Sequence, residues 1–108
     1  MTVQEMQAAV TAWEARNFPD ATPEQRALIV CEEAGELAHV VLKRAQNIRP
    51  ESSTDEKLQD AIGDIAITLM VNCGSRGWDF WEIVERTAQT VLARNWRIDA
   101  VQAAKGKQ

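Results

Sequence analysis

The chain has 108 residues, 45% of them hydrophobic and 26% charged, and its net charge is -4. This length suggests a single domain, and the composition argues against a chain that is disordered throughout. Lysine and arginine are scattered outside the short C-terminal segment. We therefore expect no nucleic-acid partner, because a nucleic-acid groove needs a basic surface. We expect no membrane partner either, because no segment approaches the roughly 18 apolar residues of a membrane span.

Apolar residues recur at helical spacing in four segments, and no segment has the pattern of a strand. The first predicted helix covers residues 3–16 and ends before two prolines. The second covers residues 23–44. Thr22 can cap this helix, Pro23 suits its first position, and Gln25 completes a capping box.

Two further helices follow a polar loop. The third, with Ser53 or Thr54 as its cap, is predicted to run to residue 76 and to stop at Gly77. The fourth is predicted over residues 80–96, with Asp79 as its cap. All the predicted elements are therefore helices.

The second predicted helix is apolar on two opposite sides of a helical wheel. The arc expected to form the core contains Val30, Ala34, Leu37, Ala38, Val41 and Leu42. The opposite stripe contains Ile29, Glu32, Glu33, Glu36 and Val40. The third predicted helix repeats this pattern, with a core seam of Leu58, Ile62, Ile65, Leu69 and Cys73 opposite a stripe of Asp60, Asp64, Ile67 and Val71.

A helix that is apolar on both sides needs cover on both sides. Four helices supply this cover only in part. We therefore expect subunits to pack together, as a homodimer or a homotetramer, with the acidic stripes facing each other in a cleft. Residues 1–98 would form one all-α domain, a four-helix bundle completed by oligomerisation, and residues 99–108 a flexible C-terminal tail.

Five carboxylates in a partly buried cleft repel one another and lose hydration, so they need a positive partner. Spacings of three and four residues place the acids of each helix on a shared face. Mg²⁺ prefers oxygen ligands and is often held by carboxylates together with substrate phosphates. We predict Mg²⁺ at these residues, with Mn²⁺ as a substitute, and the ligands Glu32, Glu33, Glu36, Asp60 and Asp64. One carboxylate, Glu33 or Glu36, would act as general base for a water that attacks phosphorus.

The two acidic motifs resemble those of the MazG-like proteins, which are all-α nucleotide pyrophosphohydrolases. The signature of that superfamily is E-E-x-x-E on one helix and E-x-x-D on the next. The stretch EEAGE at residues 32–36 matches the first half, and DAIGDI at residues 60–65 looks like the second. Ala61 stands where the family has Glu, and Asp60 lies on the same helix face as Asp64 and can replace that Glu as a ligand.

The resemblance covers residues 7–97. It implies Mg²⁺-dependent hydrolysis of a nucleoside triphosphate, NTP or dNTP, between the α- and β-phosphates, with a monophosphate and pyrophosphate as products. It also implies a dimeric or tetrameric helical bundle. Asn72 resembles an asparagine of the family that contacts the substrate. The preferred base and sugar and the biological role stay open.

Several candidate substrate contacts have a second interpretation. Arg94 and Arg97 can reach the triphosphate, or they can simply favour the C-terminal end of a helix. Trp13 or Trp96 can stack on a base, although large aromatic residues often pack in a core or an interface. Asn72 can bind the substrate or form a hydrogen bond between helices.

Two other functions are compatible with the sequence. Glu36 and His39 form the Glu-x-x-His unit of di-iron bundles, although the third helix offers Asp where such sites need further Glu residues. Ala61 favours a helical regulatory or interaction module that has lost catalysis. Cys31 and Cys73 lie in apolar helical patterns, so we expect reduced, buried thiols and a cytoplasmic location, in the host if the chain is phage-encoded.

Overall fold

The computed structural model of the protein describes residues 1–97 and residue 105. Over these residues the α-helices are α1 (Val3–Asn17), α2 (Pro23–Gln46), α3 (Asp55–Gly74) and α4 (Phe80–Leu92), with a short 3-10 helix, η1 (Pro50–Ser52), between α2 and α3. No strand occurs in this part of the chain, so the all-α prediction is confirmed. No helix in it is both long enough and apolar enough to cross a bilayer. The predicted tail, apart from residue 105, lies outside the described residues.

Each α-helix begins at a polar side chain that accepts a hydrogen bond from a backbone N–H of the first turn. These caps are Thr2, Thr22, Thr54 and Asp79. The predicted capping box is present, because the Gln25 side chain in turn accepts from the backbone N–H of Thr22. Short-range polar patterns therefore locate the helix starts correctly.

The helix ends differ from the prediction by one residue in α1, by two in each of α2 and α3, and by four in α4. α2 continues to Gln46 and stops where Asn47 adopts the left-handed conformation, with φ of 54°. α4 ends at Leu92, earlier than predicted, and beyond this end the backbone N–H of Arg94 donates to the Val91 carbonyl at 3.1 Å.

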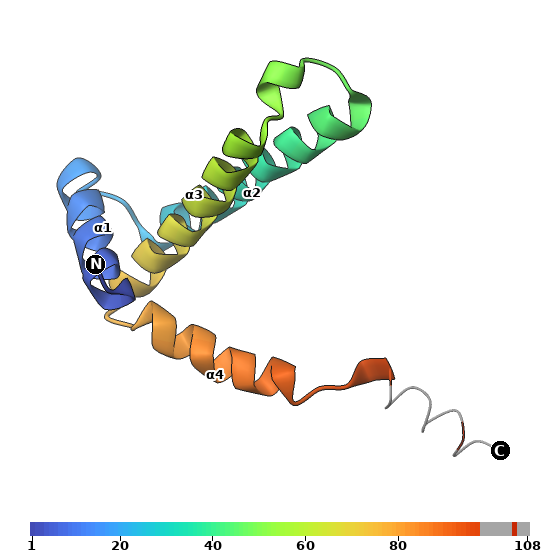
Figure 1. The fold of residues 1–108 in the computed structure, drawn as a ribbon. Helices are drawn as coiled ribbons and strands as arrows, with labels where there is room; N and C mark the ends of the chain where they lie inside the picture. Colours follow the sequence, from blue (N-terminus) through green and yellow to red (C-terminus); the bar gives the residue numbers. More distant parts are fainter. Residues whose placement is uncertain (98–104, 106–108) are drawn as a thin grey trace.

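α2 and α3 lie side by side as an antiparallel hairpin, α1 packs at its open end, and α4 runs away from it (Figure 1). The buried side chain of Gln7 joins α1 to the turn between α3 and α4. Its Nε2 donates to the Trp78 carbonyl at 2.8 Å, and its Oε1 accepts from the backbone N–H of Phe80 at 2.9 Å. Gln7 therefore fixes the point from which α4 departs.

The core within one chain is small. Its buried apolar side chains are Val40, Ala61, Met70 and Val71, and no side chain among the described residues is completely buried. The radius of gyration is 18.7 Å, whereas a compact domain of this length has a radius of about 13 Å. The helices therefore leave much apolar surface uncovered.

The predicted core faces of α2 and α3 are not buried within a single chain, and in this respect the prediction is wrong. Val41 on α2 and Ile62 on α3 are each about half exposed. The buried residues Val40 and Val71 belong instead to the acidic stripes. The reason is that α2 and α3 contact each other along the edges of these stripes, while α4 leaves the opposite face uncovered. Cys31, predicted to be buried, is exposed on that face.

α1 and α3 approach closely at Gly74, where the Thr11 side chain occupies the space that a Cβ would need. We expect Gly74→Ala to force the helices apart and to lower the free energy of unfolding by about 1–3 kcal/mol, the usual cost of overpacking. Urea unfolding followed by circular dichroism measures this change, and Thr11→Ala in the same chain should restore part of the loss.

Gly63 offers a matched control for this substitution. A Cβ at Gly63 meets nothing within 4 Å, so Gly63→Ala should raise the free energy of unfolding by about 0.5–1 kcal/mol through its helix propensity. Equal effects of the two substitutions would contradict the close approach at Gly74.

Candidate active site

α2 and α3 bring carboxylates of both sequence motifs to one cavity. Glu32 and Glu33 on α2 and Asp64 on α3 line a cavity of about 670 Å³. Its other lining residues come from α1, from the following loop and from α2 and α3, and they are Val10, Trp13, Glu14, Phe18, Arg26, Ile29, Ile67, Thr68, Val71 and Asn72. The cavity is therefore acidic over one part of its wall and apolar over another.

Glu33 lies where the acidic motifs meet. Its side chain is half-buried, and burial raises the pKa of its carboxyl group above the ordinary value. The negative charges of Asp64, Glu32 and Glu36 raise this pKa further, in that order. A cation bound near Glu33 would relieve this repulsion.

The raised pKa of Glu33 predicts how the stability of the metal-free protein depends on pH. The folded state binds the Glu33 proton more tightly than the unfolded state does. The stability that Glu33 contributes by holding its proton is therefore fully present below about pH 4, where an ordinary glutamate is protonated. This contribution is lost as the pH rises through the folded-state pKa of Glu33. We expect Glu33→Gln to raise the free energy of unfolding at pH 7 in the presence of EDTA, and the gain to disappear near pH 4.

Urea unfolding of both chains at the two pH values tests this expectation. Glu85→Gln is the control, because Glu85 is exposed on α4 and lines none of the acidic cavity. A Glu33→Gln chain less stable than the parent at pH 7 would show that burial and the neighbouring charges do not make the ionised Glu33 destabilising.

Part of the cavity wall is aromatic. Trp13 on α1 meets Phe18 edge to face, with ring centroids 6.0 Å apart and ring planes at 71°. Both side chains are about half exposed, so Trp13 does not pack in the core of the chain. Such a wall can hold the flat face of a base.

A buried ion pair and an amide tie α1, α2 and α3 together around the cavity. Arg26 Nε donates to Glu14 Oε1 at 3.0 Å, and both side chains are largely shielded from solvent. Asn72 Nδ2 donates to the carbonyl of Arg26 at 3.0 Å and to that of Thr68 at 2.8 Å. The interhelical hydrogen bond, one of the two interpretations of Asn72, is therefore present, and the substrate contact stays a prediction. Sequence reasoning missed Glu14 and Arg26, because an ion pair between different helices leaves no periodic pattern.

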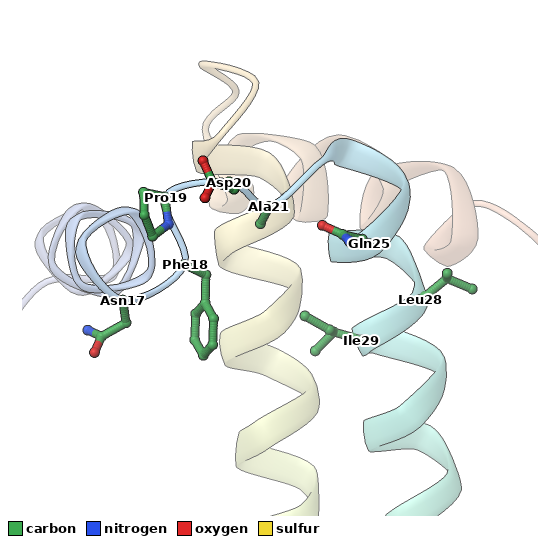
Figure 2. Close-up of a pocket in the computed structure, with 8 residues that line it drawn as sticks. All are labelled: Asn17, Phe18, Pro19, Asp20, Ala21, Gln25, Leu28 and Ile29. Carbon is green, nitrogen blue, oxygen red and sulfur yellow. The ribbon is translucent and has the colours of Figure 1, made fainter.

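A second hollow, of about 580 Å³, lies next to the acidic cavity where α1 leads into α2 (Figure 2). Figure 2 shows Phe18 and Ile29 extending into the space beside α3, while Leu28 points away from it. Phe18 and Ile29 also line the acidic cavity, so the two hollows share a wall.

Two of the five predicted ligands do not line the cavity. Glu36 still lies close enough to raise the pKa of Glu33, whereas Asp60 is exposed. Ala61, where the resemblance places a glutamate, is only 5% exposed and lies in the small core. The role of Asp60 as a replacement ligand stays a prediction.

Arg94, Trp96 and Arg97 do not reach the acidic cavity within one chain. They follow α4, which leads away from the hairpin (Figure 1). All three are exposed. The Arg94 guanidinium lies over the Trp96 ring, 5.9 Å from the ring centroid. Arg76 lies over the Trp78 ring in the same way, at 5.3 Å. A substrate contact by these residues would have to involve a second copy of the chain.

The donor chemistry around Glu33 suits a hard divalent cation, since carboxylates supply oxygen ligands only. Among residues 1–97 and 105, no three His, Cys, Asp or Glu side chains come close enough together to hold a metal ion. The carboxylates near Glu33 repel one another, and this repulsion adds to the effect of burial in raising the pKa of Glu33. Binding of Mg²⁺ would therefore require the carboxylates to turn toward one another.

Comparison of the chain with protein-family models, with curated proteins and with solved structures finds no match. The resemblance to the MazG-like proteins therefore depends on the two acidic motifs and stays a prediction.

Proposed function

We propose that this protein is a Mg²⁺-dependent nucleoside triphosphate pyrophosphohydrolase, which converts an NTP or dNTP and water to the monophosphate and pyrophosphate. The observation that carries the proposal is that Glu32, Glu33 and Asp64 line one cavity together with the aromatic pair Trp13 and Phe18. The acidic part suits the cation that accompanies a triphosphate, and the aromatic part suits a base.

The carboxylates that would hold Mg²⁺ are Glu32, Glu33, Glu36, Asp60 and Asp64. Bound Mg²⁺ supplies neutralisation of phosphate charge and a lower pKa for water. Glu33 is our choice of general base, because its raised pKa favours uptake of a proton from the attacking water. Glu36 is the alternative base, since its charge acts directly on Glu33.

The remaining roles follow from position. Trp13 would stack against the base, and Asn72, whose amide already bonds to the Arg26 carbonyl, would contact the base or sugar from the cavity wall.

We also propose a homo-oligomer, a dimer or a tetramer, because one chain leaves its apolar faces uncovered. A cytoplasmic location fits the unpaired cysteines Cys31 and Cys73.

The second candidate is a helical regulatory or interaction module without catalysis. Burial of Ala61 in the small core favours it, because the family glutamate is replaced there by a side chain that cannot bind metal. Such a module would keep the fold and would bind a nucleotide or a partner without releasing pyrophosphate.

The deciding experiment measures pyrophosphate release from a panel of standard and modified NTPs and dNTPs, with Mg²⁺ and with EDTA. We expect release with Mg²⁺ only, and a large loss of release in both Glu36→Gln and Asp64→Asn. Absence of turnover for every nucleotide, or turnover that both substitutions leave unchanged, would reject the enzyme and leave the regulatory module.

A further inference from the structure

The chain exposes more surface than a compact protein of its mass. Its accessible surface is 8227 Å², whereas a compact monomer of 12.1 kDa exposes about 6,000 Å². The surplus is about 2,200 Å² per chain, and obligate homodimers bury about 1,000–2,500 Å² per chain. A second copy of the chain can therefore cover this surplus.

One uncovered surface is the apolar face of the hairpin. α2 and α3 are antiparallel, so their helical registers place two apolar sets on the same side, away from the acidic cavity. Leu42 is 51% exposed and Ile62 is 54% exposed. We call this set the hairpin apolar face, and it consists of Ala34, Ala38, Val41, Leu42, Leu58, Ile62 and Leu69.

The other uncovered surface is the apolar half of α4. On a helical wheel, apolar residues occupy one half of α4, while Glu82, Glu85, Arg86 and Gln89 occupy the other. No residue of α4 is buried, and Leu92 at its end is 82% exposed. The apolar half of α4 consists of Phe80, Trp81, Ile83, Val84, Ala88, Val91 and Leu92.

We propose that two copies of this chain associate reciprocally, with the apolar half of α4 from each copy packed on the hairpin apolar face of the other. A twofold axis makes every such contact occur twice, so both surfaces are covered in both copies. The inference rests on the oligomer of the proposed function but not on hydrolysis, so an inactive protein would leave it untouched.

Two alternatives bury too little or conflict with the fold. Pairing of α4 with α4 alone involves helices about 20 Å long and 10 Å wide, which is far too small to bury about 2,200 Å² per chain. Folding of α4 onto its own hairpin would require a change in the turn before Phe80, where the Phe80 N–H donates to Gln7 Oε1. A reciprocal pair keeps this bond and covers both surfaces.

Sedimentation velocity at micromolar concentration tests the association. We expect twice the 12.1 kDa mass or a multiple of it, and at least a tenfold weaker association in Leu42→Glu and in Val91→Glu. Both side chains are about half exposed in one chain, so circular dichroism should show unchanged helicity. Gln89→Glu, on the polar half of α4, is the control and should associate normally. A monomeric parent chain, or Glu variants that associate normally, would overturn the proposal.

Photocrosslinking tests which surfaces meet. Val91 is replaced by p-benzoylphenylalanine in the full chain, which is mixed with a ¹⁵N-labelled parent chain, irradiated and digested for mass spectrometry. We expect crosslinks from position 91 to labelled peptides of α2 or α3. Crosslinks only to labelled α4, or only within the unlabelled chain, would reject the reciprocal arrangement.

Discussion

Glu33→Gln should lower kcat for pyrophosphate release by about 10²–10⁴-fold, the usual loss when a general base is removed. Glu33 lies where the charges of Asp64, Glu32 and Glu36 converge, and its raised pKa makes it a stronger base than an ordinary glutamate. Gln has almost the same size but neither accepts that proton nor carries the negative charge that a cation needs. Steady-state kinetics with saturating Mg²⁺ measures the loss.

The stability of the same variant separates lost chemistry from lost folding. Because Glu33→Gln removes a repelling charge, the metal-free variant should be more stable than the parent at neutral pH, and its inactivity cannot then be attributed to unfolding. Glu85→Gln, an identical change on the exposed side of α4, should leave kcat unchanged. A loss of less than tenfold in Glu33→Gln would assign the base to another residue, with Glu36 the next to test.

Much of the local structure follows from the sequence. The caps Thr22 and Asp79 lie where short polar patterns place them, because capping depends on residues only three positions apart. The division of α2 into an acidic and an apolar stripe is likewise a property of one helix, and it is present in the structure: Glu33 lines the acidic cavity while Val41 is exposed on the other side.

The sequence does not show which stripe the chain itself covers. That depends on the direction of α4. The start of α4 is held by hydrogen bonds to Gln7, which lies more than seventy positions earlier in the chain. The ion pair of Glu14 with Arg26 is similarly a contact between helices. Such contacts between helices leave no periodic pattern in the sequence. The sequence therefore predicts which helix faces are apolar, but not which of these faces the chain buries and which it leaves exposed.

Gln7→Ala should therefore have the largest effect on stability, a loss of about 2–4 kcal/mol, because it removes the side chain that bonds to two backbone groups in a partly buried place. The Trp78 carbonyl and the Phe80 N–H lose their bonds at 2.8 and 2.9 Å, and the Met70 carbonyl loses a weaker one at 3.4 Å. Urea unfolding at one fixed protein concentration measures the loss, since association also contributes to stability.

Gln4→Ala is the matched control, because Gln4 is an exposed glutamine on the same helix and should change the free energy of unfolding by less than about 0.5 kcal/mol. The loss in Gln7→Ala has a second consequence. The Phe80 N–H belongs to the first turn of α4, so without Gln7 the departure angle of α4 is no longer fixed. Association through α4 should then weaken together with folding, whereas a Gln7→Ala chain as stable as the Gln4→Ala chain would show that packing, not this side chain, directs α4.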